Sequence, residues 1–178
     1  MNNAIKWGGL MAIALIIMGL VFYLTGVTDL ETGESGILNT ILSYVISVGA
    51  IVMGISAFKK DNANYLSIGE GIKQGLLVSL IAGLILAVWT FVFFSFIEPD
   101  LLTNMQENAL GQSGDVSEEE EEMIGGIFGA IFNPGTMAFM VIIMKLFLGL
   151  IVGLIAGAIM KTDKPVEFTD DASDHLTT

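Results

Sequence analysis

Four long apolar stretches alternate with polar segments along the chain, at residues 7–24, 38–58, 76–97 and 137–160. A helix rises about 1.5 Å per residue, so about 20 apolar residues cross the ~30 Å hydrocarbon core of a bilayer. The pattern therefore predicts an all-α membrane protein with four transmembrane helices, in one membrane domain over residues 1–162. No small-x-small cleavage site follows the first stretch, so we expect it to be retained rather than removed as a signal peptide.

The third helix is predicted to begin well before its apolar stretch. Ser67 followed by Glu70 is a capping box, in which each residue's side chain satisfies a backbone N–H of the other. The helix would then start at Ile68, with its first two turns in the membrane interface. Pro99 is expected to end it, because the residue before a proline is disfavoured in the helical region.

The connection between the third and fourth spans, residues 98–134, is acidic and too long for an empty loop in a compact protein. We expect an external helical insertion, with a short helix over residues 100–110. A second, interfacial helix would begin at the capping box of Ser117 and Glu120 and continue into apolar residues that rest on the bilayer. Asn133-Pro134-Gly135 is predicted to turn the chain into the fourth span.

Five consecutive acids, Glu118–Glu122, open this interfacial helix, where the helix dipole favours negative charge. They form either a solvated helix start or a site that gathers divalent cations. We favour the first, because hard-cation sites need convergent oxygens rather than a linear run. The acidic residues 163–178 are expected to form a disordered cytoplasmic tail.

The composition agrees with a membrane protein. Hydrophobic residues make up 53% of the chain and charged residues 15%, with a mean hydropathy of +0.75. Soluble domains carry about 25% charged residues. The net charge is −12, and all seven basic residues are lysines, which argues against nucleic acid as a partner. The lipid bilayer is the partner that the composition predicts.

The lysines indicate which way the helices cross. They cluster before the first span, between the second and third, and after the fourth: Lys6, Lys59, Lys60, Lys73, Lys161 and Lys164. The other two connections contain acids and no lysine. Lysine-rich loops stay in the cytoplasm, so both termini are predicted to be cytoplasmic and both acidic loops external.

Reactive side chains are scarce. The chain has no cysteine, its single histidine is His175, and the spans contain no Asp, Glu, His or Arg. These facts disfavour thiol chemistry, a carboxylate proton relay and an axial haem ligand. We therefore expect no catalytic residue, no cofactor and no metal site, and a protein that is not an enzyme.

Small residues recur every four positions in the last two spans, and such stripes let helix backbones approach closely in lipid. The predicted packing residues are Gly71, Gly75, Ser79, Gly83 and Ala87 in the third helix and Gly149, Gly153 and Gly157 in the fourth. One interpretation is a four-helix bundle within one chain, with Gly75 nearest Gly157. The other is that a stripe forms a homo-oligomer or docks a partner subunit.

Lys145 is the only charged residue inside a span. A charge at that depth is costly and is a functional candidate. Side chains tilt toward a helix's N-terminus, here the external side, so the ammonium is expected to snorkel outward. Glu98 is the nearest plausible carboxylate, and the two form a candidate intramembrane polar pair. The alternative is a transport or gating role for Lys145.

Several short motifs together resemble a known family. They are the segment from Tyr65 to Leu76 (YLSIGEGIKQGL), the segment from Phe96 to Leu102 (FIEPDLL), a glutamate-rich helix, Asn133-Pro134 and a glycine-rich last span. This layout resembles the bacterial membrane family catalogued as domain of unknown function 4199, over roughly residues 4 to 164. The resemblance implies a four-helix protein in the inner membrane of a Gram-negative bacterium. It implies no activity or cofactor.

Two functional hypotheses follow from the sequence. The first is a small non-enzymatic integral membrane protein that serves as a packing or accessory subunit of a membrane assembly, because it has many close-packing faces and no reactive group. The second is a small transporter or channel that uses Lys145 and the glycine-lined helix faces. A polar cavity that reaches Lys145 favours transport, and a dry bundle with an exposed glycine stripe favours assembly.

Overall fold

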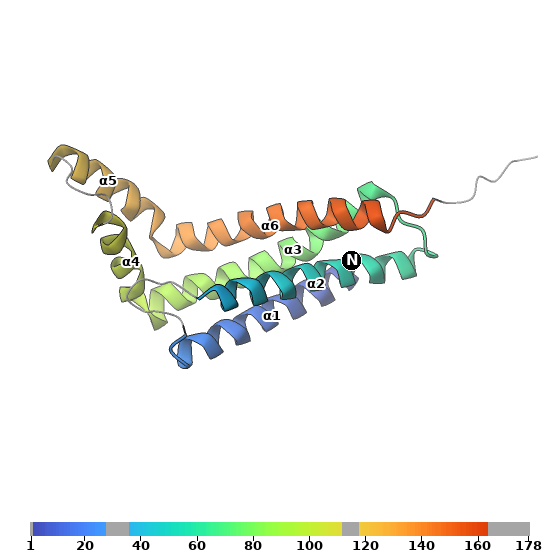
Figure 1. The fold of residues 1–178 in the computed structure, drawn as a ribbon, viewed down its shortest axis with the longest axis horizontal. Coiled ribbons are helices and arrows are strands. Elements are labelled where there is room, and N and C mark those ends of the chain that lie inside the picture. Colours follow the sequence, from blue (N-terminus) through green and yellow to red (C-terminus); the bar gives the residue numbers. More distant parts are fainter. Residues whose placement is uncertain (1, 28–35, 112–117, 164–178) are drawn as a thin grey trace, which may run out of the picture.

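The computed structural model describes residues 2–27, 36–111 and 118–163, with the backbone alone at residues 118–122. Four long helices run side by side: α1 (Asn2–Leu24), α2 (Ile37–Asp61), α3 (Ile68–Val92) and α6 (Pro134–Ile159) (Figure 1). Each is long and apolar enough to cross a membrane. The predicted all-α fold with four potential membrane-spanning helices is therefore confirmed.

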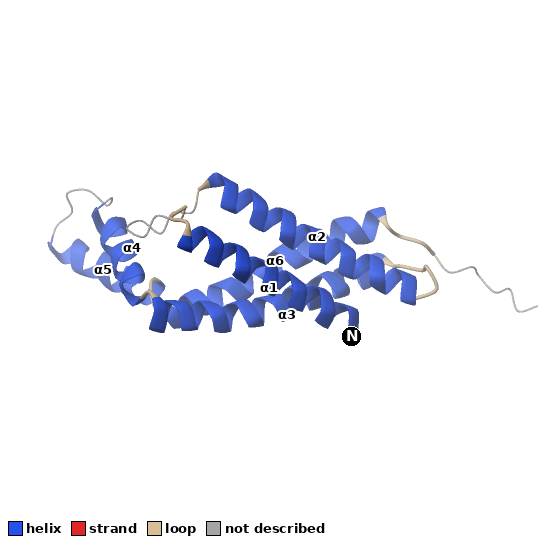
Figure 2. Ribbon diagram, turned by 90° about the horizontal axis from the view of Figure 1, so that it is seen from below, coloured by secondary structure: helices blue, strands red, loops and turns tan. Residues whose placement is uncertain are grey.

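The remaining helices lie between α3 and α6. The last turn of α3 widens into a π-helix, η1 (Phe93–Ile97), and is followed by α4 (Pro99–Gly111) and α5 (Glu118–Ile131). Both α4 and α5 lie beyond one end of the bundle, which we call the insertion end (Figures 1 and 2). Pro99 is the first residue of α4, and η1, which continues α3, ends two residues before it at Ile97. The proposed cap Ser117 and the tail residues 164–178 lie outside the described residues.

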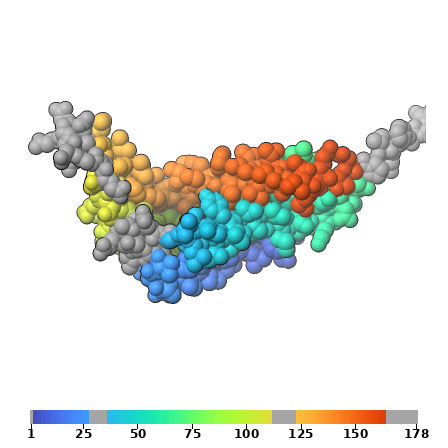
Figure 3. All heavy atoms as spheres, in the orientation of Figure 1, coloured from blue at the N-terminus to red at the C-terminus, as the bar shows by residue number. Residues whose placement is uncertain are grey.

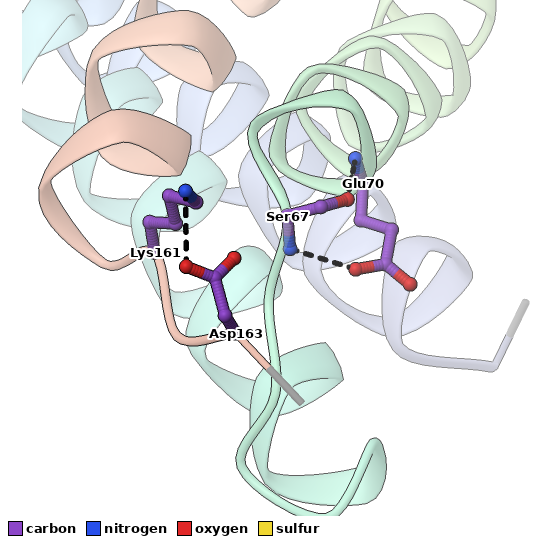
Figure 4. Close-up of polar contacts among 4 residues, drawn as sticks. All are labelled: Ser67, Glu70, Lys161 and Asp163. Atoms are coloured by element: carbon purple, nitrogen blue, oxygen red, sulfur yellow. Dashed lines mark hydrogen bonds and ion pairs between the residues drawn. The ribbon is translucent and has the colours of Figure 1, made fainter. Parts of the chain in front are cut away.

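The starts of α3 and α6 follow from local sequence. Ser67 Oγ accepts from the backbone N–H of Glu70 at 3.2 Å, and the backbone N–H of Ser67 donates to Glu70 Oε2 at 2.8 Å (Figure 4). The predicted capping box is therefore confirmed. Asn133 Oδ1 accepts from the N–H of Thr136 at 2.9 Å, with Pro134 in the first helical turn. Asn133-Pro134-Gly135 is thus a capped helix start rather than a separate turn.

Helix α3 lies at the centre of the bundle. It packs against α6 over the most extensive contact in the molecule, and also against α1 and α2. The core holds Met11, Ile51, Ile55 and Val78, each at most 1% exposed. The outward faces are also apolar, as at Val88, Phe147 and Ile159. Helices that are apolar on all sides are typical of membrane spans.

At the other end, which we call the lysine end, the segment after α6 is joined to the α2–α3 loop. Leu66 and Thr162 exchange two backbone hydrogen bonds, of 3.1 and 2.9 Å. Lys161 and Asp163 form an exposed ion pair at 3.0 Å, which contributes little to stability (Figure 4). The loop backbone has positive φ at Ala63 and Asn64.

Candidate functional site

The contact between α3 and α6 is made at the level of the backbone. A Cβ placed on Gly71 would lie 2.5 Å from the Cα of Gly157, and one on Gly75 would lie 2.8 Å from the Cα of Gly153. One on Gly149 would lie 2.6 Å from the Cβ of Ser79. Real Cβ atoms do not approach so closely, so larger residues here would force the helices apart.

This register corrects one sequence-based prediction. Gly75 was expected nearest Gly157, but it faces Gly153, and Gly71 faces Gly157. The helices are therefore shifted by one turn from the predicted pairing, because stripes that repeat every four residues fit one another almost equally well after such a shift. The structure brings Gly71, Gly75 and Ser79 together with the three α6 glycines, while Ala87 is buried further along α3.

Gly83 continues the α3 stripe and makes room for Lys145. A Cβ on Gly83 would lie 3.5 Å from the Cβ of Lys145, so the lysine stem starts against the α3 backbone. Its ammonium then reaches across to α2, where Nζ donates to Ser47 Oγ at 3.1 Å. Ser47 is fully buried. Three helices therefore meet around this one side chain.

The predicted pair of Lys145 and Glu98 is not what the structure shows. Among the described residues, no carboxylate forms an ion pair with Lys145. Glu98 instead accepts a hydrogen bond from the hydroxyl of Tyr23, which ties the insertion end of α1 to the end of η1. Lys145 lies eleven residues into α6, about 17 Å from its start, which exceeds the reach of the lysine stem. The hydroxyl of Ser47 on the neighbouring helix α2 is closer to the ammonium than the insertion end of the bundle is.

A hollow of about 420 Å³ lies beside this contact, between α2 and α6, and we call it the α2–α6 groove. Figure 3 shows α2, in cyan and teal, against α6, in orange and red, on one face of the molecule. The α2 wall is largely polar and the α6 wall is apolar apart from Lys145. The α2 wall is formed by Asn39, Thr40, Ser43, Tyr44 and Ser47, and the α6 wall by Met144, Lys145, Phe147, Leu148 and Ile151.

The polar lining stops near the middle of the helices. Toward the lysine end, a second hollow of about 340 Å³ between α2 and α6 has only apolar lining residues, among them Val52, Val152 and Ile155. Beyond it, Lys59 Nζ donates to the backbone oxygen of Met160 at 2.8 Å. A polar occupant therefore finds partners only from Asn39 to Ser47.

A further hollow of about 270 Å³ lies at the insertion end, lined by residues of α1, α3, η1 and α4 together with Asn39 of α2. Four of its lining side chains are aromatic, Tyr23, Trp89, Phe93 and Phe94, and we call it the aromatic hollow. The ring of Tyr23 packs edge-on against that of Phe93, with the ring centroids 5.4 Å apart. Asn39 lines both this hollow and the α2–α6 groove, and its Oδ1 is buried without a partner. The first turn of α2 thus borders both hollows at Asn39.

The sequence contains a signal for the polar wall. Thr40, Ser43 and Ser47 recur at helical spacing and place hydroxyls on one face of α2. The sequence pattern alone did not connect this face with Lys145, so the role of Ser47 as its partner was missed. The π-helix has no comparable signal. No three His, Asp or Glu side chains converge on a metal position anywhere in the described parts of the chain, and the side chains of Glu118–Glu122 lie outside those parts.

Comparisons with known proteins place the chain in one family. The model of the family described as "Protein of unknown function (DUF4199)" matches residues 6–162, so the chain belongs to that family. No curated protein and no solved structure matches the chain.

Proposed function

We propose that this member of the DUF4199 family is a small, non-enzymatic membrane transporter that binds an anionic group in the α2–α6 groove. A single observation carries the proposal: the Lys145 ammonium lies beside the groove, halfway along α6, with a neutral hydroxyl as its partner. A charge at the centre of a span costs about 2.5–3.5 kcal/mol on insertion scales. An anion in the groove would offset that cost more fully than Ser47 does.

The orientation follows from the lysines. We propose that the protein lies in the bacterial inner membrane with both termini in the cytoplasm, because Lys59, Lys60 and Lys161 gather at the lysine end. The insertion end and the polar half of the groove would then face the outside. The groove would present Lys145 to the external half of the bilayer.

The accessory-subunit hypothesis has weaker support. It was motivated by glycine stripes available to another chain, but the α3 stripe is covered by α6 of the same chain. A homo-oligomer or a partner subunit would have to use other faces, such as those around Gly9 and Gly49, where the space is open. The feature that discriminates the two hypotheses, a polar cavity that reaches Lys145, favours transport.

The proposal is tested by thermal unfolding of the purified protein in a non-ionic detergent. Acetate, phosphate and oleate are each added to the wild type, to Lys145→Met and to the control Lys60→Met, which changes an exposed lysine. At least one anion should raise the Tm of the wild type and the control but not of Lys145→Met, since a ligand stabilises the state that binds it. If no anion gives a Lys145-dependent shift, the proposal is wrong.

The transport step needs a second measurement. Proteoliposomes that contain the wild type should take up the bound anion faster than those that contain Lys145→Met. Equal uptake by both would limit the protein to binding and would overturn the transport role.

A further inference from the structure

We infer that the occupant of the α2–α6 groove is an anionic lipid, with an oxyanion headgroup and an acyl chain, that enters from the bilayer. This inference rests on the proposed function, because it names the class of anion that Lys145 would hold. Its basis is the shape and chemistry of the groove rather than the charge alone.

The two walls of the groove differ in kind. Hydroxyl and amide groups of α2 line one side, and Met144, Phe147 and Leu148 of α6 line the other. A small hydrated anion could form hydrogen bonds with the first wall. Against the second wall it would lose hydrating water and gain no hydrogen bond in return. An amphiphile matches both, because its headgroup can face the hydroxyls while its chain lies along the apolar side chains.

The groove also faces the surroundings of the bundle. Tyr44 on one rim is 58% exposed, and Met144 and Phe147 on the other are each 61% exposed. In a membrane, the surroundings at this depth are acyl chains. An occupant must therefore present an apolar side outward, and a lipid chain does so whereas a free acetate or phosphate ion does not.

A polar track leads to Lys145 from the insertion end. Asn39, Ser43 and Ser47 lie on one face of α2, and Asn39 is about 12 Å from Ser47 along the helix axis. A headgroup that moves along this row of side chains can exchange one hydrogen-bond donor for the next. Lys145 is the cation at the end of the row nearest the middle of the bundle. The apolar hollow beyond Ser47 offers the headgroup no further partner.

The packing of α2 leaves room for this occupant. The buried residues of α2 are Ser47, Ile51, Gly54 and Ile55, so none lies in the ten residues before Ser47. This half of α2 borders the groove, and Asn39 in its first turn also lines the aromatic hollow. The groove volume of about 420 Å³ lies within the range of small-molecule sites.

The experiment compares three matched probes in the same thermal-unfolding assay. Oleate has both the carboxylate and the chain, acetate has the carboxylate alone, and oleyl alcohol has the chain alone. We expect oleate to raise the Tm of the wild type and of Lys60→Met, and acetate and oleyl alcohol at the same concentration to raise it little. Lys145→Met should lose the oleate shift.

A second variant covers the case in which Lys145→Met does not fold. Phe147→Ser makes the exposed apolar wall polar without changing any charge, so the concentration of oleate needed for half of the shift should rise several-fold. A matched change outside the groove, Phe139→Ser on an equally exposed face of α6, should leave that concentration unchanged.

The outcomes separate the inference from the proposed function. If acetate gives the same Lys145-dependent shift as oleate, the groove takes small anions, so the inference is overturned and the proposed function stands. If oleyl alcohol matches oleate, or if Phe147→Ser has no effect, the lipid assignment is overturned. If none of acetate, phosphate and oleate gives a Lys145-dependent shift, both fail.

Discussion

A methyl group on Gly75 of α3 would lie 2.8 Å from the Cα of Gly153 of α6, so the two backbones are in contact there. The neighbouring atoms are backbone atoms, which cannot move aside as a flexible side chain can. Close approach of this kind replaces the hydrophobic driving force that is missing between helices in lipid. The α3–α6 pair is therefore the most closely packed part of the bundle, and α1 and α2 pack against it.

Gly75→Ala should consequently destabilise the protein by about 1–3 kcal/mol, the usual cost of overpacking. Gly153→Leu should have a larger effect on the same contact. The matched control is Gly49→Ala in α2, where no atom lies within 4 Å of the new methyl group. It should be neutral or stabilising, because alanine favours the helix. Thermal unfolding in detergent measures both, and equal Tm values for Gly75→Ala and Gly49→Ala would contradict this account.

The contact between Lys145 and Ser47 predicts an asymmetry between its two partners. Ser47→Ala leaves the ammonium without its hydroxyl and should cost about 1–3 kcal/mol. Lys145→Met removes the charge itself and should be tolerated or mildly stabilising. The double variant should recover most of the loss seen with Ser47→Ala alone. Additive losses in thermal unfolding would show that the two side chains do not interact.

The hydrogen bond from Tyr23 to Glu98 predicts that Tyr23→Phe lowers the Tm, because it removes the only donor in this contact between α1 and the end of η1 within the described chain. Glu98→Gln should lower it less, since an amide oxygen still accepts from the hydroxyl. Tyr44→Phe serves as the control, because the Tyr44 side chain is largely exposed. The prediction is wrong if Tyr44→Phe and Tyr23→Phe melt at the same temperature.

The capping box of Ser67 and Glu70 predicts that Ser67→Ala destabilises α3 by about 0.5–2 kcal/mol. Ser67→Thr keeps a hydroxyl at the cap and should cost much less. Hydrogen exchange of the first turn of α3 is the most direct measurement. Unchanged exchange in Ser67→Ala would show that the Leu66–Thr162 bridge, rather than the cap, holds this end.

The proposed orientation predicts the location of two reporters. A reporter fused after Thr178 should be active in the cytoplasm, and one inserted at Gly114 should be active outside. The reason is that the lysines of the connections gather at one end of the bundle. Cytoplasmic activity at Gly114 would reverse the orientation and place the polar half of the groove toward the cytoplasm.

Much of the fold was predictable because its causes are local in sequence. Apolar length alone determines which segments can span a bilayer, and the four predicted stretches correspond to α1, α2, α3 with η1, and α6. The start of α3 depends on two side chains three residues apart, Ser67 and Glu70, so the motif was sufficient. The π-helix after Val92 was not predicted, since a single extra residue in a helical turn leaves no periodic signal.

The sequence by itself determined the four apolar helices, the cap of α3 and the small-residue stripes. Only the tertiary structure decided which glycine faces which, because a stripe that repeats every four residues fits its partner almost equally well after a shift of one turn. It also decided the partner of Lys145. A flexible lysine stem reaches any acceptor within about 6 Å, so the choice of Ser47 over Glu98 depends on how α2 lies beside α6, which no local pattern specifies.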